Sequence, residues 1–170
     1  FDTIVLTIVG DYDIFIAKYD VNGNVLWAKS AGGTGNSFVN SVVLDSLGNA
    51  YVAGSFGGPT FTFDSITLSN NSSDNIFLAK YAPNGNVLWV KTARGMGVND
   101  ANSVVLDSFG NAYVTGWFVY SLNFGSVTLT NIDQMTGGSD LFLVKYDVNG
   151  NFLWAKRAGG MGGEHAYSVV

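Results

Sequence analysis

One neighbouring pair of side chains in this sequence is a candidate for acid–base chemistry. The 170 residues include one histidine, His165, and one glutamate, Glu164, which stands beside it. Such a pair can pass a proton, but a single histidine cannot supply a Ser–His–Asp triad or a histidine metal cluster. Similar stretches of the chain have Asn99-Asp100 and Ser37-Phe38 at these positions. We therefore expect no catalytic residue and no enzyme activity.

Acidic turns and glycine-rich loops are other places where a ligand could bind. Asp20 and Asp147 each begin a turn Asp-Val-Asn-Gly-Asn, whose residue types are loosely those of a calcium loop. The matching turn has Ala82 instead, so we interpret all three as ordinary turns and expect no metal. No predicted helix follows the glycine-rich stretches, as a phosphate cradle requires, so we expect no cofactor. These stretches are AGGTGN (31–36), ARGMGV (93–98) and AGGMGG (158–163).

Composition excludes several classes of protein. The net charge is −5 and only 12% of residues are charged. Nucleic-acid binding needs clustered Lys and Arg, which the chain lacks, so we expect no nucleic-acid partner. No apolar run approaches the ~20 residues of a transmembrane helix, so we expect no membrane span. Cysteine is absent, which excludes disulfides. Low charge with abundant Gly, Asn, Ser and Thr favours an extracellular or cell-surface location.

Three near-identical phrases organise the rest of the chain. They read YDVNGNVLWAK (19–29), YAPNGNVLWVK (81–91) and YDVNGNFLWAK (146–156). An Asn-Gly turn between short apolar segments predicts a β-hairpin. A second phrase, SVVLDSLGNAYVAGSF (41–56), returns as SVVLDSFGNAYVTGWF (103–118). The repeated structural positions are the tryptophans Trp27, Trp89 and Trp154 and the turn glycines Gly23, Gly85, Gly150, Gly48 and Gly110.

Together these phrases predict an all-β fold whose unit is four short antiparallel strands. In the middle unit the strands are expected at 41–44, 50–56, 76–81 and 86–91. Apolar residues stand on both faces of these strands, as expected when each sheet is sandwiched between two others. Four-stranded units repeating every ~40–65 residues predict blades of a β-propeller.

Lysine also recurs at fixed positions of the repeat. Lys29, Lys91 and Lys156 each follow a tryptophan by two residues and so share its strand face. We expect their stems to lie along the indole, with a Coulomb or cation–π contact to the next blade. The tryptophans could form a sugar-stacking array, but buried packing between blades is the favoured interpretation.

The phrases DSxGNAYVxG and KYDxNGNxLWxK resemble the SBBP family, the bacterial and archaeal β-propeller repeat. The resemblance covers nearly the whole chain, because both phrases recur in the same order. It implies a multi-bladed propeller, often within a large secreted or surface protein. It implies no enzyme activity and supplies no catalytic motif.

The repeat divides the chain into about 2.5–3 blades. We predict the second half of one blade at 1–36, full blades at 37–98 and 99–163, and the first strand of another at 164–170. FDTIVLT (1–7) aligns with FDSITLS (63–69), so the chain starts within a unit. The expected partners are further blades of the same parent chain or other copies of this chain, which would cover open blade edges.

One face of such a propeller carries uniform turns, and the other carries variable loops. The variable segments are 57–75 and 119–140 within blades and 30–40, 92–102 and 157–167 between them. Binding tends to reside on variable loops held by a rigid scaffold. The interaction residues predicted on this variable face are Trp117, Tyr120, Arg94 and His165, and Asn70 and Asn71 stand in glycosylation sequons.

Three hypotheses about function remain open from sequence. The leading one is a non-enzymatic extracellular or surface repeat protein with a structural, assembly or adhesive role. The second is a lectin-like propeller that binds glycans or surface proteins through the variable face. The third is a fragment of an enzyme whose site lies in blades outside this sequence.

Overall fold

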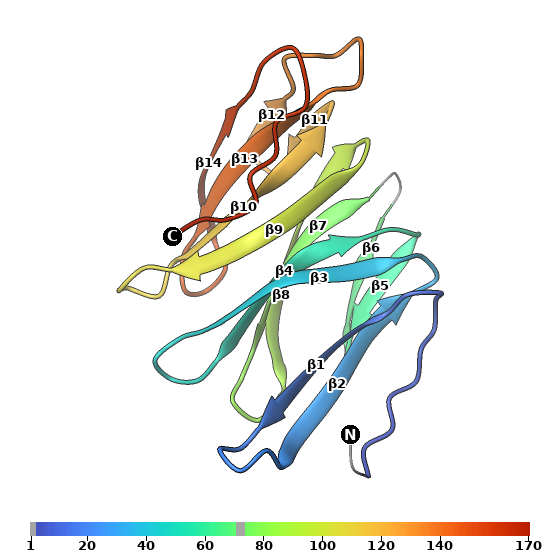
Figure 1. The fold of residues 1–170 in the computed structure, drawn as a ribbon, viewed down its shortest axis with the longest axis vertical. Helices are drawn as coiled ribbons and strands as arrows, with labels where there is room; N and C mark the ends of the chain where they lie inside the picture. The colour runs from blue at the N-terminus through green and yellow to red at the C-terminus, as the bar shows by residue number, and fades with distance from the viewer. Residues whose placement is uncertain (1–2, 71–73) are drawn as a thin grey trace.

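The computed structural model describes residues 3–70 and 74–170, which form fourteen β-strands and no helix (Figure 1). The predicted all-β fold is confirmed. In these residues there is also no helix long and apolar enough to span a membrane. The strands are β1 Ile14–Tyr19, β2 Val25–Gly33, β3 Ser37–Leu44, β4 Ala50–Phe56, β5 Thr60–Phe63, β6 Ile66–Ser69, β7 Asn75–Tyr81, β8 Val87–Met96, β9 Asn99–Leu106, β10 Ala112–Val119, β11 Ser121–Asn123, β12 Thr128–Thr130, β13 Ser139–Tyr146 and β14 Phe152–Ala158.

The four-stranded unit appears twice in full. One blade runs β3-β4-β7-β8 and the next runs β9-β10-β13-β14, all antiparallel. Their registers coincide, since Tyr51 pairs with Lys80 and Tyr113 with Lys145. β1 and β2 are the outer pair of a preceding blade. The sheets do not close into a ring, which fits part of a β-propeller.

The segments predicted as loops between the second and third strands contain hairpins. β5-β6 pairs with β2, and β11-β12 pairs with β8, so each hairpin extends the outer edge of the preceding blade. The interpretation of 57–75 and 119–140 as plain connectors is therefore wrong. The physical reason is burial: Phe61, Phe63 and Leu122 alternate with polar residues and are fully buried against the blades.

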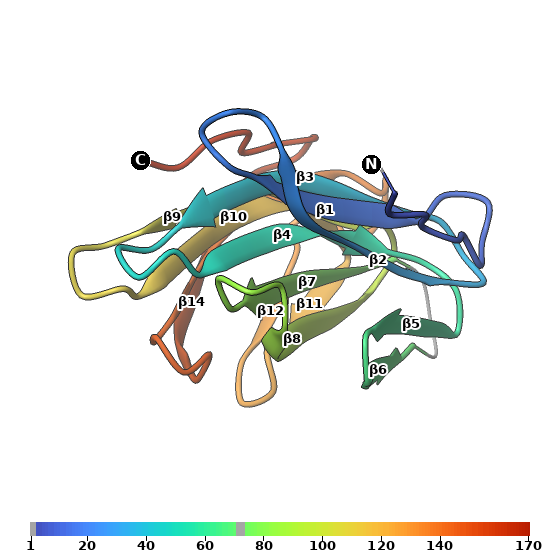
Figure 2. The ribbon, with the colours of Figure 1, turned by 90° about the horizontal axis from the view of Figure 1, so that it is seen from below.

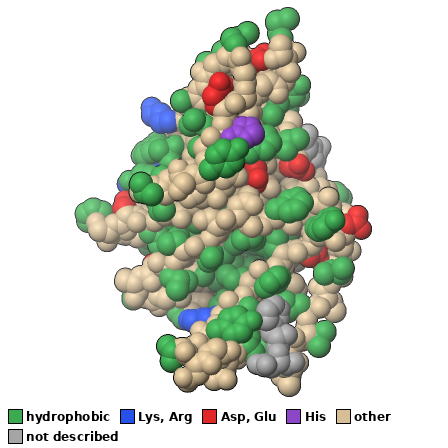
Figure 3. All heavy atoms as spheres, in the orientation of Figure 1, with side chains coloured by type: hydrophobic (Ala, Val, Ile, Leu, Met, Phe, Trp, Pro, Cys, Tyr) green, Lys and Arg blue, Asp and Glu red, His purple; other side chains and the backbone are tan. Residues whose placement is uncertain are grey.

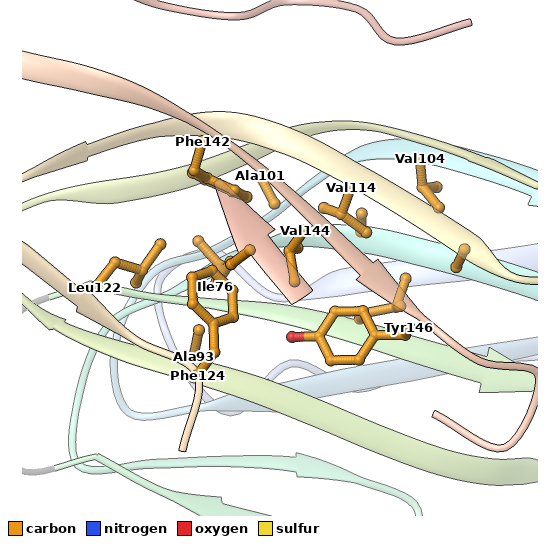
Figure 4. Packing of buried hydrophobic residues seen from close by; sticks show 14 of the residues in the cluster. Ile76, Ala93, Ala101, Val104, Val114, Leu122, Phe124, Phe142, Val144 and Tyr146 are labelled. Carbon is orange, nitrogen blue, oxygen red and sulfur yellow. The ribbon is translucent and has the colours of Figure 1, made fainter. Parts of the chain in front are cut away.

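Packing between blades supplies the core. All residues of β4 and β7 are buried, as predicted for sheets sandwiched on both faces. One cluster joins the half blade and its hairpin to β4 and β7 through Phe56, Phe61, Phe63 and Phe77. The other joins the two full blades, and Figure 4 shows Ile76 facing Phe142, Val144 and Tyr146 of the next blade.

The inner strands run side by side. β3 packs against β9, and both lie toward the upper side in Figure 2, with β8 and the hairpins below. The first strands of the two full blades, β3 and β9, are therefore in contact. This arrangement also places the repeated turns and tryptophans where one blade meets the next.

Candidate functional site

The repeated aspartate turns are closed by their own side chains. In the turn 45–49, Asp45 Oδ1 accepts hydrogen bonds from the N–H groups of Leu47 (3.0 Å) and Asn49 (2.9 Å), and its Oδ2 accepts one from Asn49 Nδ2 (2.8 Å). The bonds of Asp107 follow the same pattern, and side-chain and backbone donation by Asn111 holds its pKa well below the usual range. Turns that begin at Asp20 and Asp147 are built alike. These carboxylate oxygens accept bonds from their own turns.

The structure places the predicted turn glycines at positive φ. Gly23, Gly85 and Gly150 have φ of 83°, 86° and 76°, and Gly48 and Gly110 have 78° and 80°. In the turn that lacks aspartate, Asn84 Oδ1 accepts the N–H of Asn86 at 3.1 Å instead. Turn geometry thus accounts for both the aspartates and their replacement by Ala82. No group of three or more His, Cys, Asp or Glu side chains that could hold a metal ion occurs in residues 3–70 and 74–170.

The repeated tryptophans lie where blades meet. Trp27 Nε1 donates to the carbonyl oxygen of Pro83 in the following blade at 3.0 Å. Its ring also lies against Gly85 of that blade, and Trp89 lies in the same way against Gly150. Trp154 packs edge-on to Tyr113 at 5.9 Å. Packing between blades, the favoured interpretation of this array, agrees with the places of Trp27 and Trp89.

The third-strand lysines of the two full blades make cation–π contacts. Lys80 Nζ lies 4.6 Å from the ring centre of Tyr51 and 3.5 Å from Asp45 Oδ2. Lys145 repeats this with Tyr113 (4.6 Å) and Asp107 (3.1 Å). For the fourth-strand lysines the sequence predicted a Coulomb or cation–π contact to the next blade. Lys29 makes a Coulomb contact of this kind, an ion pair with Asp64 of the next unit at 3.4 Å, and the charge of Lys91 helps to lower the pKa of Asp147 in the next blade.

A polar link between inner strands escaped sequence reasoning. Asn40 Nδ2 donates to the carbonyl oxygen of Ala101 (3.1 Å), and Asn102 Nδ2 donates to that of Ala166 (2.8 Å). Val104 N–H donates to Ser41 Oγ (3.1 Å), and Val169 N–H donates to the equivalent serine at 3.3 Å. The signal was the Asn-Ser dipeptide before Val-Val at 40–43 and 102–105. It recurs because each copy binds the next blade.

Comparison with known families agrees with this geometry. Residues 26–55, from β2 into β4, match the model of the SBBP family, described as a β-propeller repeat. The chain contains an SBBP β-propeller repeat. The resemblance seen in the repeated phrases is thereby confirmed at residues 26–55.

Two curated proteins also resemble the chain. The uncharacterized WD repeat-containing protein L264 of Acanthamoeba polyphaga mimivirus is 30% identical over 93% of this chain, and the match covers 13% of that protein. Regulatory protein FlaEY of Caulobacter vibrioides is 30% identical over 85% of this chain and 15% of its own length. The chain thus spans a small part of both relatives, and the likeness supports its description as a repeat protein.

The face that carries the variable loops brings two predicted interaction residues together. The Trp117 and His165 rings stack at 4.6 Å and 9°, and Tyr167 Oη lies 3.4 Å from His165 Nδ1. Figure 3 shows the His165 ring on the surface next to apolar side chains. Tyr120 has a positive φ of 63°, and its carbonyl oxygen accepts bonds from Asn131 and Gln134.

The remaining predicted positions lie elsewhere. Arg94 is on β8, where its Nη2 donates to Ser69 Oγ at 3.3 Å. Asn70 is 4% exposed and directly follows β6. Asn71 lies outside the described residues. Glycosylation of either asparagine stays a prediction.

Proposed function

We propose that the chain is a non-enzymatic scaffold of SBBP blades, located outside the cell or on its surface, with a structural, assembly or adhesive role. One observation carries the proposal: the side chains that repeat are used in contacts within and between blades. Trp27 contacts the next blade, Lys80 binds Asp45 and Tyr51, and Asn40 binds the next inner strand. Because the same contacts recur from unit to unit, the repeated side chains are best explained by the packing of one blade against the next.

The carboxylates that could serve an enzyme support the same proposal. Asp45 and Asp107 each accept three hydrogen bonds from their own turn and pair with a lysine. A general base or nucleophile needs an accessible group aimed at a substrate. These groups instead fix the turns. The low charge of the whole chain, 12% of residues, motivates the extracellular location.

A second candidate function is ligand binding on the variable face. The stacked pair of Trp117 and His165 favours it, because an accessible aromatic surface with an adjacent polar ring suits sugars and flat polar ligands. A glycan array would test this candidate with the chain and its Trp117→Ala variant. Binding that the variant loses would support it, and an array without binding would reject it.

The scaffold proposal is tested on the parent protein in its own cells. Intact cells are treated with a protease, and this repeat is followed by antibody alongside a cytoplasmic marker. Cleavage of the repeat with the marker untouched is expected. Electron microscopy of the purified parent should then show a lattice, fibre or rigid multi-bladed body. Protection of the repeat until lysis, or turnover of a substrate by the purified parent, would reject the proposal.

A further inference from the structure

Three segments of the variable face meet around one tyrosine. They are the loop 96–98, the bend 119–121 and the turn 131–137, which lie at the end of the strands opposite the uniform turns (Figure 1). The carbonyl oxygen of Tyr120 accepts the N–H of Asn131 at 2.8 Å, which joins the bend to the turn. Exposed apolar side chains of these segments form the Tyr120 patch. Its members are Met96, Val98, Tyr120, Ile132 and Met135, which are 66%, 48%, 36%, 46% and 94% exposed.

Tyr120 has a backbone conformation that tyrosine rarely adopts. Its φ of 63° lies in the left-handed region, which is unfavourable for a residue with a Cβ. The ring lies against Gly97, since Tyr120 Cδ2 is 3.0 Å from where a Cβ on that glycine would stand. The corresponding bend of the other unit has Gly58, with a φ of 79°. A left-handed bend at this place therefore needs no aromatic side chain, so folding alone does not explain the tyrosine.

Other members of the patch also differ from the repeat. Val98 has the counterparts Asn36 and Gly163 in the corresponding loops between blades. Ile132 and Met135 stand in a stretch that is longer than its counterpart in the other unit. The contacts that hold the blades together recur, whereas these residues are particular to one unit. Large apolar side chains gathered on a surface mark a place of interaction, and tyrosine and methionine are enriched in interfaces.

Charge is distributed unevenly over the chain. The lysines recur on the third and fourth strands of the blades, where Lys80 pairs with Asp45 and Lys145 with Asp107. The variable face has seven acidic side chains and two arginines among the described residues, an excess of five negative charges. The acidic residues are Asp11, Asp13, Asp74, Asp100, Asp133, Asp140 and Glu164, and the arginines are Arg94 and Arg157. A field of this sign attracts a cationic partner and repels an anionic one.

We propose that the Tyr120 patch docks a basic segment of another protein, in which apolar side chains stand next to lysine or arginine. The apolar side chains of that segment pack on the patch, and its cationic groups are drawn to the carboxylates of the variable face. Anionic membranes and nucleic acids share the sign of this field, and so does a second copy of the chain, so all three fit poorly. This inference goes beyond the proposed scaffold role, and it does not use the stacked rings of Trp117 and His165.

The first test selects ligands for the purified chain from a display library of random peptides. Enriched peptides are expected to carry a net positive charge and at least one large apolar side chain. The double variant Val98→Asn, Met135→Ser should lose them. Leu47→Ser with Phe109→Ser is the matched control, because these two side chains are 78% and 81% exposed on the uniform turns. That control should keep the peptides. No enrichment, enrichment of acidic peptides, or the same peptides on the patch variant would overturn the proposal.

The second test measures the affinity of the best peptide by fluorescence anisotropy. Tyr120→Asn removes the ring and keeps a residue that tolerates the left-handed backbone. It should weaken binding about tenfold or more, as expected for an aromatic anchor at the centre of an interface. Higher salt should also weaken binding, because it screens the carboxylates. Met135→Ser, at a side chain 94% exposed, repeats the test without risk to the fold.

Urea unfolding of each variant shows whether it is folded, so that a loss of binding is attributed to the patch. Affinity that neither variant changes, or that salt does not change, would overturn the proposal. The same variants are tested against a glycan array, anionic vesicles and self-association in the ultracentrifuge. Loss of any of these interactions in place of peptide binding would assign the patch to a different partner and would also overturn the proposal.

Discussion

Gly85 lies against the indole ring of Trp27 in the preceding blade. A Cβ on Gly85 would stand 2.8 Å from Trp27 Cδ2, which is closer than carbon atoms pack without displacement. Gly150 holds the same relation to Trp89, with 3.0 Å to its Cδ2. The Asn-Gly turn of each of the two full blades therefore covers the tryptophan of the blade before it. Glycine is needed there for its positive φ and for this close approach.

Gly85→Ala is expected to destabilise the chain more than Gly23→Ala. Both glycines have nearly the same φ, 86° and 83°, so both variants bear a left-handed cost of about 1–2 kcal/mol. Nothing lies within 4 Å of a Cβ on Gly23. The contact with Trp27 should therefore add about 1–3 kcal/mol for Gly85→Ala alone. Urea unfolding of the two variants measures the difference, and equal costs would mean that the turn does not lie on Trp27 in solution.

Lys80 and Asp45 should be more strongly coupled than Lys29 and Asp64. The first pair is nearly buried, with side chains 8% and 13% exposed, whereas the second is 34% and 36% exposed. Water screens the exposed pair, for which a coupling energy of about 0.2–1 kcal/mol is typical. Two double-mutant cycles in urea, with Lys→Met and Asp→Asn, compare the couplings directly. A coupling for Lys80 no larger than that for Lys29 would contradict the predicted order.

The Asp107 turn predicts an acid-sensitive contribution to stability. Its pKa is lowered in the folded chain, chiefly by the side-chain and backbone bonds from Asn111. A lowered folded pKa gives stability that is present above the ordinary value of 3.8 and lost as the pH falls through the folded pKa. Asp107→Asn should thus be less stable than the parent at pH 7. This difference in stability should narrow below about pH 4. Urea midpoints from pH 7 to pH 2 measure this difference, which should not stay constant.

Asp74→Asn is a control in which the expected change in stability at pH 7 has the opposite sign. Burial, followed by the charge of Asp100, raises the pKa of Asp74 in the folded chain. Its ionisation therefore costs stability, beginning as the pH rises above the ordinary value of 3.8 and complete above the folded pKa. The variant should raise the urea midpoint at pH 7, and its advantage should disappear below about pH 4. A loss of stability at pH 7 would show that the carboxylate is favourably paired.

Sequence reasoning predicted the parts of the fold that local chemistry decides. Asn-Gly turns and alternating apolar residues were enough to place β3, β4, β7 and β8 and their order. The β3 strand began earlier than expected, at Ser37, because a bulge between Val39 and Ser41 lets pairing continue past it. Hydrophobic periodicity alone does not reveal such a bulge.

Contacts between repeats were harder to predict, because they depend on which faces meet. Lys80 reaches a tyrosine across its own sheet, a contact that sequence spacing did not indicate. Stacking of Trp117 on His165 joins residues from different units, and no local pattern signals it. The hairpin β5-β6 did carry a signal, since Phe61 and Phe63 alternate with threonine. No pattern in the sequence indicated that this hairpin pairs with β2 of the preceding blade.

Phe61→Ala tests whether that hairpin holds two blades together. Phe61 is fully buried, and its ring lies 5.0 Å from that of Phe56 and 5.4 Å from that of Phe77. Its truncation should cost about 3–5 kcal/mol of unfolding free energy, as for other buried phenylalanines. Phe109→Ala is the matched control, because Phe109 is 81% exposed in a turn and should change stability by no more than about 0.5 kcal/mol. Equal effects in urea unfolding would show that residues 60–69 form the solvated loop expected from sequence and not an added pair of strands.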